Sequence, residues 1–243
     1  NLEITAKILI ELQEKGADII ELGIPYSDPL ADGPIIQLSA SRALKSGTSL
    51  TKVLELLRSL KSKLHIPVIL FTYFNPLLCF GFDRFCRVAS EVGAAGIIIP
   101  DLPLEETTEF TKIASKFNLD LILLIAPTTP TERMKIISEK TRGFTYLVSV
   151  TGVTGERNNL ENRVENLIIK LKQISSKPIA IGFGISSPEH VKKIRAWGAD
   201  GVIIGSAFVK RISESDESLV VKRVGQFCEE IRFAADQSLD NDL

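Results

Sequence analysis

The sequence predicts an α/β fold of the (β/α)8 barrel (TIM barrel) type, and two features carry this prediction. Short runs rich in Ile, Val and Leu alternate along the whole chain with segments of helical periodicity. The apolar runs show no polar alternation, which is typical of parallel strands covered on both faces. Because 243 residues suffice for one such barrel, we expect residues 1–243 to form a single domain.

Seven apolar runs have the length and composition of strands. They are residues 18–22, 66–73, 96–100, 120–127, 144–149, 178–184 and 201–207. The segments between them have helical periodicity: 3–16, 48–63, 82–92, 105–116, 131–140, 158–175, 187–197 and 217–234. Within 51–60 one helical face is entirely apolar: Val53, Leu54, Leu57 and Leu60. Such regular alternation predicts βα units joined by right-handed crossovers.

The number of strands is one short of a closed barrel, which needs eight. The chain opens on a helical segment, residues 3–16, with no strand before it. We therefore expect the first strand of the barrel to be missing ahead of Asn1, and a genuine seven-stranded barrel is the alternative. At the other end, the acidic residues 236–243 are expected to be frayed.

Composition removes several classes of function. The net charge of −1 provides no electrostatic basis for binding nucleic acid or an anionic membrane, and no apolar run reaches the ~20 residues that span a bilayer. The cysteines, Cys79, Cys86 and Cys228, have no metal-type spacing, so reduced thiols are expected. His65 and His190 lie in unrelated segments. No metal site is indicated.

The most informative stretch is residues 21–34, E-L-G-I-P-Y-S-D-P-L-A-D-G-P. It starts at the end of an apolar run and continues as a loop rich in Pro and Gly, with carboxylates at Glu21, Asp28 and Asp32. A Glu among strand apolars is costly to bury unless it is paired, protonated or used in chemistry. By itself this pattern leaves open a purely structural carboxylate.

Further candidate residues follow the later strands, where the working groups of such barrels lie. Gly184 follows the penultimate strand, and Gly205 and Ser206 follow the last. Glycines let backbone N–H groups approach an anion closely, and Ser206 adds a hydroxyl donor. The pattern predicts a phosphate site, with simple tight turns as the alternative. It does not by itself distinguish among phosphate-binding barrels, since isomerases and synthases share it.

The stretch 21–34 closely resembles the signature of the tryptophan synthase alpha subunit family, the indole-3-glycerol-phosphate lyases. Asn75-Pro76 and Asp101-Leu102-Pro103 also match this family, and the resemblance covers essentially the whole chain. Tyr26 stands where Phe is frequent in the signature, a variation that we regard as tolerated.

The resemblance implies a retro-aldol cleavage of indole-3-glycerol phosphate to indole and glyceraldehyde 3-phosphate, without metal or organic cofactor. Carbon–carbon cleavage requires protonation at indole C3, for which Glu21 is the expected acid, with a raised pKa among its apolar neighbours. Glu21 would then accept the proton of the glycerol C3′ hydroxyl. Asp32, on a polar loop, is expected to stay ionised, to accept a hydrogen bond from the indole N–H and to stabilise the developing positive charge.

The same resemblance assigns the remaining substrate contacts. The loop 150–163 corresponds to the segment that covers the active site in the family, with Thr154 in the lid and Gly155 near the phosphate. Tyr73, Ile125 and Tyr146 are expected to hold the indole ring, and Phe71 and Ile98 are weaker candidates. Tyr146 has core packing as its alternative.

The resemblance also implies a protein partner, the beta subunit, in an alpha2-beta2 tetramer. Asp28, Pro29, Asn75 and Pro103 are expected at that interface. The alternatives are a stand-alone lyase that releases free indole, another phosphate-binding barrel isomerase or synthase, and a non-enzymatic regulatory subunit. The expected location is the cytoplasm, or the plastid stroma in a photosynthetic eukaryote.

Overall fold

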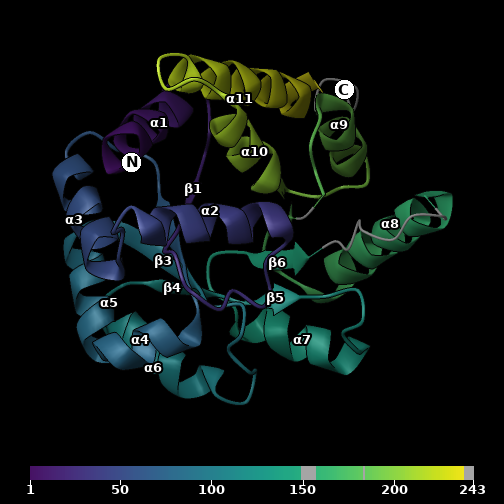
Figure 1. Cartoon of the computed structure of the whole chain (residues 1–243). Helices are drawn as coiled ribbons and strands as arrows, with labels where there is room; N and C mark the ends of the chain where they lie inside the picture. Colours follow the sequence, from purple (N-terminus) through teal and green to yellow (C-terminus); the bar gives the residue numbers. More distant parts are fainter. Residues whose placement is uncertain (149–156, 183, 238–243) are drawn as a thin grey trace. The chain divides into compact units, whose positions relative to one another are not determined.

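The computed structural model describes residues 1–148, 157–182 and 184–237 (Figure 1). Its strands form two parallel four-stranded sheets, in the orders β1-β2-β3-β4 and β5-β6-β7-β8. The strands are β1 (Ile20–Gly23), β2 (Val68–Phe71), β3 (Ala94–Ile98), β4 (Asp120–Ile122), β5 (Leu124–Ile125), β6 (Thr145–Val148), β7 (Ile179–Gly182) and β8 (Gly201–Ile203). All of them fall within or next to the predicted apolar runs.

The helices occupy the segments between the strands. They are α1 (Leu2–Glu14), α2 (Pro34–Lys45), α3 (Leu50–Leu60), α4 (Phe74–Phe80), α5 (Phe82–Glu91), α6 (Thr107–Lys116), α7 (Thr131–Lys140), α8 (Arg157–Ile174), α9 (Pro188–Ala196), α10 (Ser206–Glu214) and α11 (Val220–Gln237). The eight helical segments expected from periodicity are all confirmed.

The chain divides into two compact units. The first comprises Asn1–Leu121 and Val209–Glu229, and the second comprises Ile122–Phe208 and Glu230–Leu243. The single-domain assignment of residues 1–243 stays a prediction, as does the strand expected ahead of Asn1. Of the tail expected to be frayed, 236–243, Asp236 lies in α11 and pairs with Arg232 at 2.8 Å, and residues 238–243 lie outside the described residues.

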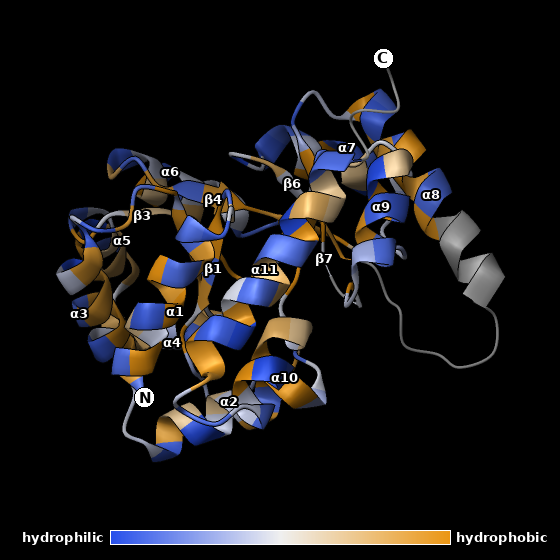
Figure 2. Ribbon diagram, turned by 90° about the horizontal axis from the view of Figure 1, so that it is seen from above, coloured by the Kyte–Doolittle hydropathy of each residue, from blue (hydrophilic) through white to orange (hydrophobic). Residues whose placement is uncertain are grey.

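In the first unit, helices with one apolar face cover the sheet. The predicted face of α3 is confirmed, with Val53, Leu54, Leu57 and Leu60 all buried. The helix begins where the Ser49 side chain accepts a hydrogen bond from the Lys52 N–H, which satisfies one of its free donors. α1 packs on α3 and β1, and α5 packs on α3, α6 and β3 (Figure 1). In Figure 2 the ribbon of α3 accordingly carries both hydrophobic and hydrophilic stretches.

β1 differs from the expected strand buried on both faces. Ile20 and Leu22 are buried, whereas Glu21 and Gly23 keep accessible surface. Among the described strands, β1 pairs with β2 alone and is the first in its sheet, so it has fewer neighbours than a central strand. Successive side chains of β1 point to opposite faces, and the two faces therefore differ in burial.

The predicted strand 120–127 is interrupted at Leu123, which separates β4 from β5. The Leu123 N–H donates to the Thr141 hydroxyl at 2.9 Å instead of to a neighbouring strand. The Thr141 hydroxyl in turn donates to the Phe144 carbonyl at 2.8 Å. The Thr141 hydroxyl thus takes the place of the strand carbonyl that would otherwise accept the Leu123 N–H. No local pattern in the sequence indicates this interruption.

Three helices, α2, α4 and α10, were not predicted. α2 buries no residue among its twelve, so it lacks the apolar stripe by which helices are detected. α4 contains Pro76, a residue that favours a loop interpretation but is tolerated in the first turn. α10 follows directly on Gly205, so its start was assigned to a phosphate loop. None of the described helices is long and apolar enough to cross a membrane.

Candidate active site

The two predicted catalytic carboxylates lie in the first unit, on β1 and the loop that follows it. Glu21 is the second residue of β1 and pairs in register with Ile69 of β2. Because β1 and β2 run parallel, the loop after β1 and the segment after β2 leave the sheet at the same edge. The structure therefore brings the Asp32 loop and Tyr73 together.

Glu21 has the electrostatic environment of a general acid. It retains accessible surface, but the protein atoms around its carboxyl group raise its pKa from 4.5 to about 7. The negative charge of Asp32 raises the pKa in the same direction. The accessible surface refers to the residue as a whole, whereas desolvation of the carboxyl group is the larger cause of the raised pKa. The raised pKa agrees with the sequence-based expectation.

Asp32 is less exposed than its polar loop suggested. It is half-buried, and burial raises its pKa. A hydrogen bond from the Tyr73 hydroxyl partly opposes this shift, because it favours the carboxylate form. Asp32 is thus not an ordinary solvated carboxylate, and Tyr73 is the described side chain whose hydrogen bond supports its ionised form.

Tyr73 fixes the Asp32 loop through two contacts. Its side chain is buried, with 3% of the residue accessible, and its hydroxyl accepts the Ala31 N–H at 3.0 Å while bonding to the Asp32 carboxylate. Burial and the charge of Asp32 raise the pKa of the Tyr73 hydroxyl, so it remains a proton donor. Sequence analysis predicts Tyr73 in the indole pocket, and the structure shows in addition a contact with the Asp32 carboxylate that the sequence does not indicate.

The predicted partner segments meet around the start of α4. Asp101 accepts the Phe74 N–H at 2.8 Å, which satisfies a free donor in the first turn of α4. Asn75, Asp28 and Pro103 keep accessible surface, and Pro29 is half-buried. Beside them Leu30 is 92% accessible, which is unusual for a large apolar side chain.

The predicted phosphate donors lie in the second unit, after two neighbouring strands. β7 and β8 run parallel with Gly182 opposite Ile203, so the loops that follow them begin at one edge of the sheet. Gly184 is accessible and has φ of 75°, a conformation that suits glycine. Ser206 is accessible and is the first residue of α10. Its hydroxyl lies at a helix start, a position that favours an anion.

Tyr146 is buried, and its position depends on Gly182. A Cβ added at Gly182 would come within 2.4 Å of the Tyr146 hydroxyl oxygen and 2.7 Å of its ring. Only glycine leaves room for the ring at that place in β7. Sequence analysis places Gly182 within the apolar run 178–184 and does not indicate this role. A glycine inside a strand was the available signal, since it marks a close approach by another group.

The other predicted pocket residues are placed as follows. Ile125 in β5 and Ile98 in β3 are fully buried, and Phe71 is half-buried at the end of β2 with its ring 6.5 Å from that of Tyr73. Thr154 and Gly155, assigned to the lid and the phosphate site, lie outside the described residues. Of the predicted loop 150–163, residues from Arg157 onward belong to α8.

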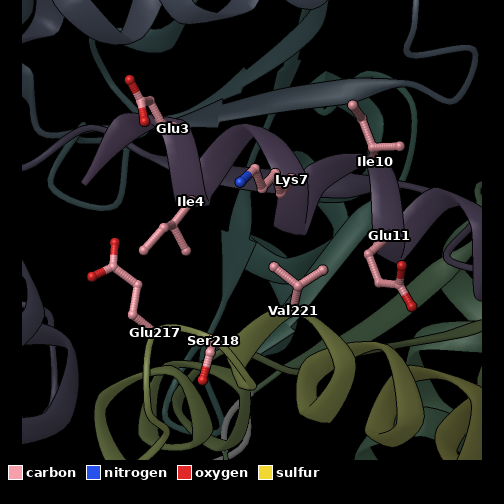
Figure 3. Close-up of a pocket in the computed structure, with 8 residues that line it drawn as sticks. All are labelled: Glu3, Ile4, Lys7, Ile10, Glu11, Glu217, Ser218 and Val221. Atoms are coloured by element: carbon pink, nitrogen blue, oxygen red, sulfur yellow. The ribbon is translucent and has the colours of Figure 1, made fainter.

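One cavity of about 460 Å³ lies in the first unit between α1 and the start of α11 (Figure 3). Its lining combines apolar and charged side chains: Glu3, Ile4, Lys7, Ile10, Glu11, Glu217, Ser218 and Val221. None of them is a predicted site residue, so we do not assign the chemistry to this cavity. Among the described residues, no three His, Cys, Asp or Glu side chains gather in a group that could hold a metal ion.

Carboxylates that follow one parallel strand and glycines that follow two others are a pattern typical of phosphate-binding enzymes of the barrel class. The family model for the tryptophan synthase alpha chain matches residues 1–236. The tryptophan synthase alpha chain of Prochlorococcus marinus subsp. pastoris is 73% identical over 237 residues, covering 98% of this chain and 85% of the relative. The chain belongs to the tryptophan synthase alpha chain family.

Solved structures agree. The tryptophan synthase subunit alpha of Legionella pneumophila superposes with a TM-score of 0.88 at 36% identity, covering 97% of this chain and 88% of that one. A chain from the tryptophan synthase complex of Pyrococcus furiosus gives a TM-score of 0.86 at 38% identity, covering 94% and 91%. The fold is the predicted (β/α)8 barrel, and the activity is the lyase cleavage of indole-3-glycerol phosphate.

Proposed function

We propose that Glu21 and Asp32 carry out the cleavage as an acid and an electrostatic stabiliser. The observation that supports this most strongly is the pKa of about 7 at Glu21, beside a second carboxylate. At neutral pH a substantial fraction of Glu21 is protonated and able to deliver a proton to indole C3. As the carbon–carbon bond breaks, the resulting carboxylate accepts the proton of the C3′ hydroxyl, so Glu21 ends protonated again.

Asp32 has a different role, the stabilisation of positive charge on the substrate. Protonation at C3 makes the indole ring cationic, and the Asp32 carboxylate stabilises that charge through the ring N–H. The Tyr73 hydroxyl supports the required ionised state by donating to Asp32. Tyr73, Ile125 and Tyr146 supply apolar contacts for the indole ring, with Thr154 on the covering loop.

Gly184, Gly205 and Ser206, with Gly155, bind the phosphate of the substrate. Their support is the shared sheet edge after β7 and β8 and the accessible Ser206 at the start of α10. Binding energy from this remote group orients the reacting bond. No metal or organic cofactor is required, because both proton transfers are made by Glu21.

The phosphate role of Ser206 can be tested by Ser206→Ala. A hydrogen bond to a charged group contributes about 1.5–3 kcal/mol, so we expect KM to rise about 10- to 100-fold, with a smaller change in kcat. Ser213→Ala is the matched control, because Ser213 lies on the same helix and donates to the Lys210 carbonyl at 2.8 Å. Equal KM values for the two variants would contradict the assignment.

We further propose a beta-subunit partner that receives the indole and contacts Asp28, Pro29, Asn75 and Pro103. The accessible Leu30 in the same loop supports this, as does the solved tryptophan synthase complex of Pyrococcus furiosus. The cyanobacterial relatives favour the cytoplasm as the location. The stand-alone lyase differs in one prediction, that added beta subunit leaves indole release unchanged.

The deciding experiment measures indole release by the chain alone and with a cyanobacterial beta subunit. We expect the beta subunit to raise kcat, and we expect Leu30→Asp to weaken this response while leaving the basal rate intact. Leu219→Asp serves as the control, since Leu219 is also exposed in the first unit but lies just before α11. A wild-type rate that does not respond to the beta subunit would favour the stand-alone lyase.

A further inference from the structure

The position at which this chain departs from the family signature, Tyr26, makes a contact that phenylalanine cannot make. The Asn75 side-chain amide donates to the Tyr26 hydroxyl at 3.1 Å. Tyr26 lies in the loop after β1, and Asn75 lies in the first turn of α4, after β2. The bond therefore ties together the two segments that leave neighbouring strands of one sheet.

The Tyr26 ring also contacts the residue that holds Asp32. The ring centroids of Tyr26 and Tyr73 are 5.5 Å apart with an angle of 34° between their planes, within the range of favourable aromatic pairs. Tyr73 in turn bonds to Asp32 and accepts the Ala31 N–H at 3.0 Å. A continuous series of contacts thus runs from Asn75 through two tyrosines to the carboxylate.

We propose that Tyr26 is a positioning residue that couples Asn75 to Asp32. With its hydroxyl held by Asn75, the Tyr26 ring restrains Tyr73, and Tyr73 holds the Asp32 carboxylate in its working orientation. The inference rests on the proposed role of Asp32. The Asp101 carboxylate anchors the exposed start of α4 by accepting the Phe74 N–H. Through Asn75 and Tyr26, this start of α4 sets the geometry of the loop that carries Asp32.

The test compares Tyr26→Phe, Asn75→Ala and the double variant in the lyase assay. Tyr26→Phe keeps the ring and removes only the hydroxyl. We expect kcat to fall roughly 2- to 10-fold in each single variant, the effect of one hydrogen bond, with little change in KM. The double variant should match the singles, because both substitutions remove the same contact.

The pH profile separates positioning from a general structural role. The Tyr73 hydrogen bond favours the carboxylate form of Asp32, so loosening it should raise the pKa of Asp32. Activity that needs ionised Asp32 is then lost at a higher pH, and the acid limb of kcat moves upward in both single variants. Denaturant midpoints measured in parallel show whether a fall in kcat reflects unfolding. Asn75 is exposed, so its replacement by Ala provides a second variant that should stay folded.

Two results would overturn the proposal. Unchanged kcat and an unchanged acid limb in Tyr26→Phe would show that its hydroxyl does not position Asp32. Multiplying losses in the double variant would show that the two residues act separately. Asp32→Asn, assayed alongside, separates a failure of this proposal from a failure of the proposed function. If Asp32→Asn keeps full activity, the role proposed for Asp32 is wrong, whatever the result with Tyr26→Phe.

Discussion

Replacing Glu21 by Gln is expected to reduce indole release about 10²- to 10⁴-fold, the usual contribution of a general acid–base group. Glutamine has nearly the shape of the protonated acid but cannot deliver a proton to indole C3 or accept one from the C3′ hydroxyl. The substitution therefore removes both proton transfers and leaves phosphate binding intact. A steady-state assay should show the loss in kcat, with KM largely retained.

The pH dependence of the wild-type enzyme follows from the same group. Glu21 must be protonated to start the reaction, and its pKa is about 7. We expect kcat to fall as pH rises through about 7, and we expect the small residual rate of Glu21→Gln to lack this limb. A wild-type rate that is flat from pH 6 to pH 8 would contradict Glu21 as the acid.

The stability of the wild-type protein should also fall as pH rises, for a related reason. The pKa of Glu21 is higher in the folded protein than its ordinary value of 4.5, so between about 4.5 and 7 the folded state binds the proton more tightly than the unfolded chain. Wild-type stability therefore falls as pH rises through this window. Glu21→Gln has no such titration and should gain stability relative to wild type toward pH 7 and above.

Denaturant unfolding at pH 5 and pH 8 measures this difference. Glu14→Gln is a matched control, because Glu14 is an exposed carboxylate at the end of α1 in the same unit. We expect Glu14→Gln to keep wild-type activity and the wild-type dependence of stability on pH. If Glu21→Gln retained activity while remaining folded, another group would have to supply the proton.

Gly182→Ala is expected to damage both stability and activity. The new methyl group would lie 2.4 Å from the Tyr146 hydroxyl oxygen and 2.7 Å from the ring, far inside contact distance. Tyr146 is buried, so relief requires movement of packed side chains or of β7. Overpacking of this kind costs about 1–3 kcal/mol. Because Tyr146 is a predicted wall of the indole site, we also expect a loss of about 10²-fold in kcat/KM.

A second substitution tests whether the clash is the cause. In a Tyr146→Leu background, the added methyl group no longer meets the ring, so Gly182→Ala should cost much less stability than in wild type. Gly201→Ala is the matched control, since its Cβ would come only within 3.6 Å of the Ala180 Cβ, an ordinary contact. Equal costs for Gly182→Ala in the two backgrounds, measured by urea unfolding, would refute the explanation.

Much of the architecture was predictable because parallel strands covered by helices leave a strong local pattern. The run around Ile69 is continuously apolar, and Val53 and Leu57 recur at helical spacing, so β2 and α3 were evident. Helices whose apolar side chains stay accessible gave no comparable signal. Leu38 in α2 is 63% exposed, and the helix depends on local propensity and the Pro34 start instead of on burial.

The candidate site, too, was predictable from the sequence only in part. The sequence by itself determined the strand–helix order, the family, and the residue types that the reaction needs, because Glu21, Asp32 and Ser206 lie in motifs that are contiguous in the chain. Only the tertiary structure decided which groups act on those residues. Tyr73 supports Asp32 across 41 positions of sequence and Tyr26 meets Asn75 across 49, since parallel neighbouring strands bring their following loops to one edge. Gly182 likewise acquires its importance from the Tyr146 ring, because space inside a packed sheet is a property of the fold and not of any local pattern.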